Sequence, residues 1–352
     1  MQKKEVRKER RKPEKSKKYK VRSKKQEVRN PGTDVGMHID HFLKKTFTKT
    51  VIVIAGPTAV GKTTVALQLA KHFNTAIISA DSRQCFKELN IGVARPSAEE
   101  LREVKHYFIA SHSIHETVTA AGFEQYALQK VQELFQQHDV VIMVGGTGLY
   151  IKAFCEGLDS IPEIDPAIRQ SIITAYEEKG IGWLQEQLHA KDPAFAAAGE
   201  MQNPQRMMRA LEVKESTGQS ILSFRKGEKA QRDFNIIKIG MELSKEELHR
   251  NIHSRVDQMM QAGLPEEVKQ LLPYKQLNAL QTVGYAELFD YFDGKWTLEE
   301  AVERIKINTR QYAKRQLTWF RKDKEIQWFA PGDVDAMKKW LDERVSKSMQ
   351  DY

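Results

Sequence analysis

A phosphate-binding motif is the first feature of the chain that could do chemistry. Residues 56–63 spell GPTAVGKT, an uninterrupted match to G-x-x-x-x-G-K-[ST]. Apolar residues 51–55 before it predict a buried strand, and the apolar residues within 65–73 have helical spacing. In this order the loop's backbone N–H groups and the positive end of the helix face a polyphosphate. Lys62 adds a positive charge, and the hydroxyl of Thr63 is placed to ligate Mg²⁺.

The loop predicts a phosphate site without naming the ligand. Its expected members are Gly56, Pro57, Thr58, Ala59, Val60, Gly61, Lys62 and Thr63. A second buried strand, predicted at 140–144, ends in glycines around Thr147, where P-loop NTPases usually carry an acidic Mg²⁺ ligand. This difference argues against an ordinary ATPase. The Thr147 hydroxyl can donate to a ligand oxygen, although a plain strand-to-helix turn would tolerate the same residue.

A carboxylate follows the strand predicted at 75–80. Ligands of open α/β sheets bind outside the carboxyl ends of the strands, which places Asp81 for chemistry. Capping the next turn is an equally common task for an aspartate in this position. The local sequence leaves both roles open.

The elements that must position these groups form an alternating pattern. Strand patterns at 51–55, 75–80, 140–144 and 236–241 alternate with helices, which predicts a P-loop α/β core with a parallel sheet. We expect the histidines within 104–113 to lie in a turn, without metal-ligand spacing. A single helix bearing Arg255 is predicted over 248–272, and a short turn at 281–285.

The domain organisation follows from helices without intervening strands and from the composition of the ends. The predicted parts are a disordered basic tail (1–48), an α/β core (49–161 and 234–330), an all-helical insertion (162–233) and a C-terminal helix or tail (331–352). The insertion carries Arg206 and Arg209 on one helix face.

Charge and composition exclude several classes of protein. Residues 1–50 hold 18 lysines and arginines against 6 acidic residues, whereas the remaining 302 hold 38 against 41. The tail is therefore either a nucleic-acid-binding arm or a solvated segment, and Met37 is an alternative start. Two cysteines provide no disulfide framework, and no apolar run suggests a membrane span. We expect a cytoplasmic protein.

A basic helix is predicted near the C-terminus, over 298–324. Residues 304–324 contain eight lysines and arginines and one acidic residue, Asp323. The basic stripe of this helix consists of Lys306, Arg310, Lys314 and Arg321. A neighbouring apolar stripe, expected to pack, consists of Ile305, Tyr312 and Trp319. The free basic stripe predicts a phosphodiester-backbone site, the alternative being a solvated face.

Six motifs together resemble one family, the bacterial tRNA dimethylallyltransferases. They are GPTAVGKT, ISADSRQ, GGTGLYIKA, NPQRMMRALEV, QTVGY and YAKRQLTWFR, and they occur in the family's order. The resemblance covers about residues 50–325 and leaves out the basic tail. It implies transfer of a dimethylallyl group from dimethylallyl diphosphate to N6 of adenosine 37 in tRNA. The partners would be tRNA and dimethylallyl diphosphate, the cofactor Mg²⁺, and the protein a monomer.

The resemblance also assigns catalytic roles. The family pattern makes Asp81 the group that accepts a hydrogen bond, and finally a proton, from the adenine amine. Thr147 would donate to the oxygen that bridges the dimethylallyl carbon and the diphosphate, where negative charge grows. Lys62, Thr63 and Mg²⁺ would stabilise the departing diphosphate, and Arg255 would help to bind it. The absence of an acidic residue near Thr147 is consistent with a ligand that has no γ-phosphate.

The same resemblance implies an extended tRNA contact. The expected residues are Asp81, Ser82, Arg83, Gln84, Thr147, Arg169, Gln205, Arg206, Met207, Met208, Arg209, Gln281, Thr282, Val283, Gly284, Tyr285 and Ala286, with residues 314–321, which include Lys314, Arg315 and Arg321. One departure lies at Asn251, where many relatives carry an arginine. If that arginine is a diphosphate ligand, Arg250 or Arg255 must replace it. Base extrusion from the anticodon loop would expose the acceptor.

Three alternatives use parts of the same sequence. A small-molecule kinase would use the phosphate loop with ATP and would not need the basic helix. A prenyltransferase acting on free adenine nucleotides would tolerate charge reversal along Lys306, Arg310 and Lys314. A non-catalytic RNA-binding protein would bind tRNA without saturable diphosphate binding at Lys62.

Overall fold

The computed structural model of the protein describes residues 49–348. The predicted basic tail, 1–48, therefore lies outside the described residues. Within 49–348, no helix combines the length and the apolar character needed to cross a membrane.

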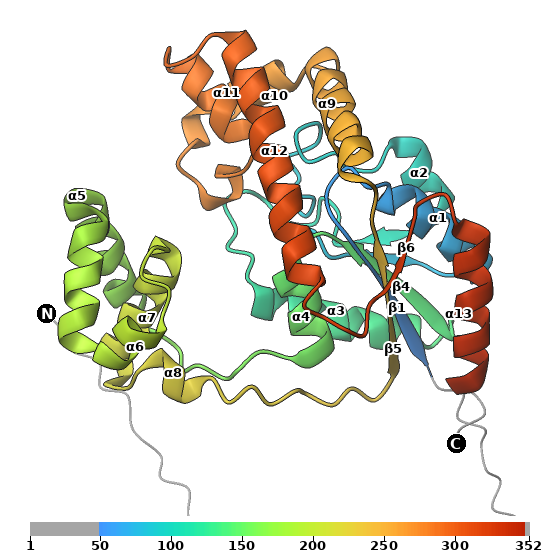
Figure 1. The fold of residues 1–352 in the computed structure, drawn as a ribbon, viewed down its shortest axis with the longest axis horizontal. Coiled ribbons are helices and arrows are strands. Elements are labelled where there is room, and N and C mark those ends of the chain that lie inside the picture. Colours follow the sequence, from blue (N-terminus) through green and yellow to red (C-terminus); the bar gives the residue numbers. More distant parts are fainter. Residues whose placement is uncertain (1–48, 349–352) are drawn as a thin grey trace, which may run out of the picture. The chain divides into compact units, whose positions relative to one another are not determined.

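A parallel sheet forms the centre of the structure (Figure 1). Its order is β3-β2-β4-β1-β5-β6, and each neighbouring pair is parallel. The strands are β1 (Thr50–Ala55), β2 (Ile77–Ser79), β3 (His106–Tyr107), β4 (Val140–Gly145), β5 (Asn235–Met241) and β6 (Gln327–Phe329). The central strands are almost wholly buried, as expected for a sheet covered on both faces. The predicted parallel α/β core is confirmed.

Helices connect the strands and fill the segment between β4 and β5. The helices up to β5 are α1 (Lys62–His72), α2 (Ala98–Glu103), α3 (Ala120–Leu134), α4 (Gly148–Glu156), α5 (Pro166–Lys191), α6 (Pro193–Ala198), α7 (Pro204–Thr217) and α8 (Ile221–Phe224). Those after β5 are α9 (Lys245–Gln261), α10 (Leu264–Gln270), α11 (Tyr285–Phe292), α12 (Leu298–Phe320) and α13 (Val334–Ser348), with 3₁₀ turns at Leu272–Tyr274 and Asn278–Leu280.

Alternate residues of β1 enter two separate cores. Ile52 and Ile54 pack with residues of α1 and α13 on one face of the sheet. Val51 and Val53 pack with residues of α3 and α4 on the other. This division follows from the strand period of two, because successive side chains point to opposite faces. Helices therefore pack on both faces of the sheet and fix the positions of the strand ends.

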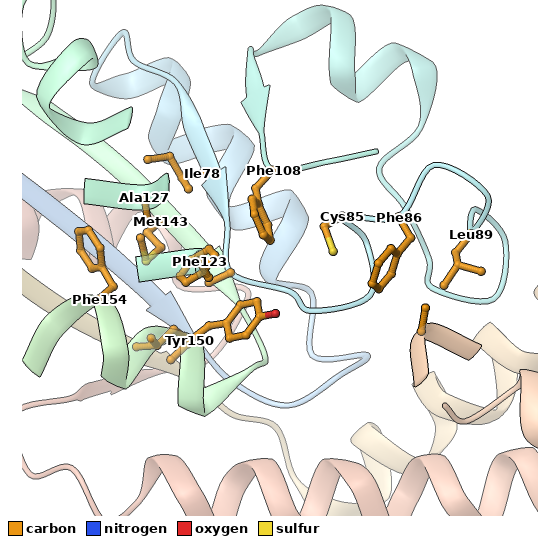
Figure 2. Close-up of a cluster of buried hydrophobic side chains, with 14 of the residues drawn as sticks. Ile78, Cys85, Phe86, Leu89, Phe108, Phe123, Ala127, Met143, Tyr150 and Phe154 are labelled. Atoms are coloured by element: carbon orange, nitrogen blue, oxygen red, sulfur yellow. The ribbon is translucent and has the colours of Figure 1, made fainter. Parts of the chain in front are cut away.

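Aromatic side chains build the second of these cores. Figure 2 shows Phe108, Phe123 and Tyr150 grouped beside the loop that carries Cys85 and Phe86. The rings of Phe123 and Tyr150 stack at 4.5 Å between centroids, and Phe108 meets Phe123 edge to face at 5.0 Å. Stacked and edge-to-face pairs are the favoured geometries of aromatic rings. The packing fixes α4 against α3 and against the segment that follows β3.

The segment between β4 and β5 contains helices α5 to α8 and has a core of its own. Leu184, Leu188, Met207 and Leu211 are among its buried residues. Within α5 the backbone leaves the helical conformation at Gly180, where φ is 76°. The absence of strands agrees with the predicted helical segment at 162–233, and the domain boundaries themselves stay a prediction.

Two local expectations differ from the structure. The helix predicted over 248–272 is two helices, because the chain turns at Gly263 with φ 95°, between α9 and α10. A positive φ of this kind favours glycine and ends a helix. The segment expected as a turn around His106 instead contributes β3, which pairs with β2 at the sheet edge.

Candidate active site

The phosphate loop connects β1 to the N-terminus of α1 as the motif predicts. Gly61 precedes the helix with φ 97°, a conformation that suits glycine. The Lys62 ammonium donates to the carbonyls of Gly56 at 2.9 Å and Pro57 at 2.7 Å. Lys62 therefore lies folded over the loop, where an anion would compete for its charge.

Burial and neighbouring charges change the pKa of Lys62. Desolvation lowers the pKa of Lys62 to about 7, and the Arg255 cation adds to this effect, whereas the Asp81 carboxylate opposes it. Desolvation also lowers the pKa of Arg255, again opposed by Asp81. Two cations thus lie close together beside the loop, an arrangement that a polyphosphate would stabilise.

Helix α9 supplies Arg255 and Asn251 to the loop. Arg255 Nη1 donates to the hydroxyl of Thr58 at 3.3 Å, and Asn251 Nδ2 donates to the carbonyl of Ala59 at 3.2 Å. Arg250 is exposed. Of the two arginines that flank Asn251, Arg255 is therefore the one that lies against the phosphate loop.

Asp81 follows β2 at the carboxyl edge of the sheet. One carboxylate oxygen, Oδ1, accepts hydrogen bonds from the backbone N–H groups of Arg83 at 2.8 Å and Gln84 at 3.2 Å. This is the capping role that the sequence left open. The side chain also lines the pocket described below, so capping orients the carboxylate without removing it from the pocket.

Thr147 lies at the end of the neighbouring strand. Its Oγ1 accepts from the backbone N–H of Ser82 at 3.0 Å and donates to the Ser82 hydroxyl at 3.3 Å. The backbone N–H of Thr147 donates to the carbonyl of Ala80 at 3.2 Å. Thr147 is the N-cap residue before α4, but its side chain makes no capping hydrogen bond. Its hydroxyl therefore bonds to the turn after Asp81 and not to its own helix.

A pocket of about 600 Å³ lies beside these groups, although Lys62 and Thr147 are not among the residues that line it. Thr58 and Arg255 border it on the loop side, and Asp81 borders it at the end of β2. Its apolar lining includes Val93, Val256, Met259, Val283 and Ile305. Of the segment predicted at 281–286, the lining residues are Gln281, Thr282, Val283, Gly284 and Ala286. A pocket that combines apolar walls with a few convergent polar groups is typical of a ligand site.

Helix α12 contributes an aromatic and a cationic side chain to the same pocket. Tyr312 and Arg315 both line it, and the Arg315 guanidinium lies 5.8 Å from the centre of the Tyr312 ring. Tyr312 and Trp319 are 36% and 37% exposed, so the apolar stripe expected to pack is only partly buried, at Ile305. An exposed ring beside a guanidinium is suited to stacking on a base.

The predicted basic stripe of α12 is largely engaged in contacts within the protein. Lys306 pairs with Asp257 at 3.0 Å and Glu303 at 3.1 Å. Arg310 contacts the His253 ring at 2.8 Å. Arg321 pairs with Glu242 at 2.9 Å. The expectation that this whole stripe is free for phosphates was wrong, and Arg315 is the α12 cation that faces the pocket.

Several residues expected to contact tRNA have side chains buried elsewhere. Met207 and Met208 belong to the core of helices α5 to α8. Tyr285 is fully buried and donates to Glu267 at 2.6 Å. Side chains in these positions support the fold and cannot stack on a base.

The remaining expected residues of helices α5 and α7 lie outside the pocket lining. Arg169 and Arg209 both pair with the buried Glu212, at 3.7 Å and 3.1 Å, and Arg206 pairs with Glu200. Gln205 is exposed. Arg169 and Arg206 remain more than half exposed, so their charges are accessible from solvent.

Gln316 lies within the YAKRQLTWFR motif and within residues 314–321, which were expected to contact tRNA, but the structure buries it inside the site. Its carboxamide oxygen accepts from the N–H of Thr58 at 2.8 Å, and its nitrogen donates to the carbonyl of Gly146 at 2.9 Å. Its signal in the sequence was its place in that motif, whereas its burial and both hydrogen bonds are known from the structure alone.

A metal ion at this site would need oxygen atoms of the bound phosphate substrate among its ligands. Among residues 49–348, no group of three or more His, Cys, Asp or Glu side chains could hold a metal ion. Thr63 lies at the start of α1 and is half-buried. One hydroxyl with substrate phosphates and water fits Mg²⁺, which often binds through few protein ligands.

Comparisons with known proteins show the family of the chain. The family model described as IPP transferase matches residues 84–323. A tRNA dimethylallyltransferase of Cytophaga hutchinsonii is 46% identical over 299 residues, covering 85% of this chain and 98% of the relative. A tRNA dimethylallyltransferase of Christiangramia forsetii is 50% identical over 279 residues, covering 79% and 92%.

Solved structures give the same answer. The tRNA isopentenylpyrophosphate transferase of Bacillus halodurans superposes with a TM-score of 0.64 at 33% identity, covering 86% of this chain and 98% of that one. A eukaryotic dimethylallyltransferase, described as acting on tRNA, superposes with a TM-score of 0.67 at 25% identity, covering 84% and 77%. The chain belongs to the IPP transferase family.

Proposed function

We propose that this protein is a tRNA dimethylallyltransferase. It transfers the dimethylallyl group of dimethylallyl diphosphate to N6 of adenosine 37 in tRNA and releases diphosphate. The observation that carries the proposal is one shared pocket, bordered by phosphate-loop residue Thr58, by Asp81 and by the basic, aromatic face of α12. The names of the relatives support the same reaction.

The leaving group binds at the phosphate loop. Backbone N–H groups of the loop, the N-terminus of α1 and the cations Lys62 and Arg255 stabilise the diphosphate as negative charge accumulates on it. Thr63 and oxygens of the diphosphate would hold Mg²⁺, which would supply further positive charge at the leaving group. The apolar lining formed by Val256, Met259 and Ile305 is suited to the dimethylallyl chain.

The acceptor enters from the side of α12. The exocyclic amine of adenine is a weak nucleophile because its lone pair is delocalised into the ring. Asp81 accepts a hydrogen bond from this amine and takes its proton as the new C–N bond forms. The hydroxyl of Thr147 donates a hydrogen bond to the bridging oxygen as the C–O bond breaks. Tyr312 and Arg315 hold the flipped nucleotide by stacking and charge.

The RNA contact extends beyond the pocket. Ser82, Arg83, Gln84, Gln281, Thr282, Val283, Gly284, Ala286 and Lys314 are the proposed neighbours of the extruded nucleotide, with Arg169, Gln205, Arg206 and Arg209 as cations and amides for the tRNA backbone. The substrate implies action in the cytoplasm, where tRNA is modified. The monomeric state stays a prediction.

One assay tests the reaction. Purified protein is incubated with dimethylallyl diphosphate, Mg²⁺ and an unmodified tRNA that carries adenosines at positions 36 to 38, and the digested nucleosides are analysed. We expect N6-(dimethylallyl)adenosine and an equal amount of diphosphate. Lack of the prenylated nucleoside, with the protein folded and the tRNA intact, contradicts the proposal.

Three parallel arms test the alternatives. Phosphorylation of a small molecule with ATP would indicate a kinase. Equal prenylation of AMP and tRNA would indicate a free-nucleotide acceptor. A non-catalytic RNA-binding protein would bind tRNA tightly but would show no saturable binding of diphosphate. In a prenyltransferase that binding should be present and Lys62→Met should abolish it.

A further inference from the structure

Gln316 connects three parts of the site that are distant in sequence. It lies on α12, is only 7% exposed and bonds to the backbone at Thr58 in the phosphate loop and at Gly146 in the β4–α4 turn. Both bonds are short, at 2.8 and 2.9 Å, and both use the same carboxamide. A carboxamide has a donor and an acceptor on one rigid group, so it can hold both backbone groups at the same time.

Gly146 leaves the space that this carboxamide occupies. A Cβ atom built on Gly146 would lie 2.3 Å from Gln316 Nε2, and every other contact outside the adjacent residues would be at 3.5 Å or more. The obstacle to a side chain at position 146 is therefore the amide group of Gln316 and not the backbone. The glycine and the glutamine form a matched pair.

The two bonded peptide groups belong to two different parts of the proposed active site. Thr58 belongs to the loop that would hold the diphosphate, and Gly146 directly precedes Thr147, which would donate to the bridging oxygen. The helix that carries Gln316 also carries Tyr312 and Arg315 in the acceptor pocket. One buried side chain thus relates the leaving-group site, the turn that carries the hydrogen-bond donor Thr147 and the acceptor-binding helix.

We propose that Gln316 is a positioning residue, which sets the distance between the phosphate loop and Thr147 for prenyl transfer. It touches neither substrate and acts through the two backbone groups that it holds. This inference rests on the proposed function. A displacement of about 1 Å in reacting groups can cost about 10²-fold in rate, so a lost bridge should appear in kcat.

The first experiment separates positioning from binding. Gln316→Met keeps the length and loses both hydrogen bonds, whereas Gln316→Glu keeps the acceptor for the Thr58 N–H and loses the donor to Gly146. We expect kcat to fall about 10²-fold for Met and by less for Glu, with the KM values for tRNA and dimethylallyl diphosphate within about threefold of wild type. Gln311→Met, at an exposed position of the same helix, is the matched control and should keep wild-type kcat.

The results have distinct meanings. A folded Gln316→Met variant with wild-type kcat overturns the inference, and a loss confined to the KM for tRNA would make Gln316 an RNA contact instead. Wild-type protein that forms no prenylated adenosine contradicts the proposed function, whereas equal rates for wild type and Gln316→Met contradict only this inference.

A double-mutant cycle tests the pair if Gln316→Met fails to fold. Gly146→Ala should displace the Gln316 amide and lower kcat about tenfold. In a Gln316→Ala background the new methyl group has room, so Gly146→Ala should cause no further loss of kcat. If the two substitutions instead lowered kcat by independent factors that multiply in the double variant, the proposed pairing of Gly146 with Gln316 would be contradicted.

Discussion

The hydroxyl of Thr147 accepts a hydrogen bond from the backbone N–H of Ser82 at 3.0 Å. These residues lie 65 positions apart, at the carboxyl ends of the neighbouring strands β4 and β2. The contact joins the turn that orients Asp81 to the turn that carries Thr147. A parallel sheet therefore brings to one edge the proposed base for the incoming amine and the proposed hydrogen-bond donor for the departing oxygen.

Removal of the Thr147 hydroxyl should slow the chemical step. Thr147→Val keeps the shape of the side chain but has no donor for the bridging oxygen, and we expect kcat to fall about 10²- to 10³-fold. Thr147→Ser restores the hydroxyl and should recover most of the rate. Single-turnover prenylation of tRNA measures both, and a Val variant as fast as wild type would remove Thr147 from the mechanism.

Neutralisation of Asp81 should separate its two roles. Asp81→Asn keeps an oxygen that can accept from the N–H groups of Arg83 and Gln84, so the turn should persist. The amide cannot take the proton of the adenine amine, and we expect turnover to fall about 10²- to 10⁴-fold. Binding of tRNA, measured by filter retention, should stay nearly intact. Near-normal turnover would show that the base is elsewhere.

The pKa of Lys62 predicts a pH-dependent affinity for diphosphate. Because this pKa is lowered from 10.5 to about 7, most of the free protein carries a neutral Lys62 at pH 8. Bound diphosphate favours the charged amine, so binding should take up a proton, and affinity should decrease as pH rises above 7.

Calorimetry at pH 8 in two buffers of different ionisation enthalpy measures this proton uptake. Lys62→Met, which has no titrating group, provides the control and should bind diphosphate weakly with less proton uptake. Equal uptake by the two proteins would place the titrating group elsewhere.

Charge reversal should distinguish the two kinds of cation on α12. Arg315→Glu removes a positive charge from the pocket, so tRNA affinity should fall and the salt dependence of binding should weaken by about one unit of slope. Lys306→Glu instead places a third carboxylate beside Asp257 and Glu303, and should mainly lower the free energy of unfolding. Salt-dependent binding and urea unfolding measure these effects, and the reverse pattern would refute this assignment.

The sequence by itself was sufficient to place the candidate residues that follow the ends of strands. The order of strand, loop and helix around Lys62 is local, and the carboxyl ends of parallel strands meet at one edge. The strand patterns that precede Asp81 and Thr147 are therefore sufficient to place both residues near the loop. The repeated strand and helix patterns were likewise sufficient for the parallel α/β core.

Tertiary structure alone decided which side chains are available. Periodicity defines the faces of α12 but not their partners, and Arg321 pairs with Glu242, 79 residues earlier. For the same reason the sequence could not show that Met207, Met208 and Tyr285 are buried. The link from Gln316 to Thr58 spans 258 residues, and only the packed chain brings such groups within hydrogen-bond distance.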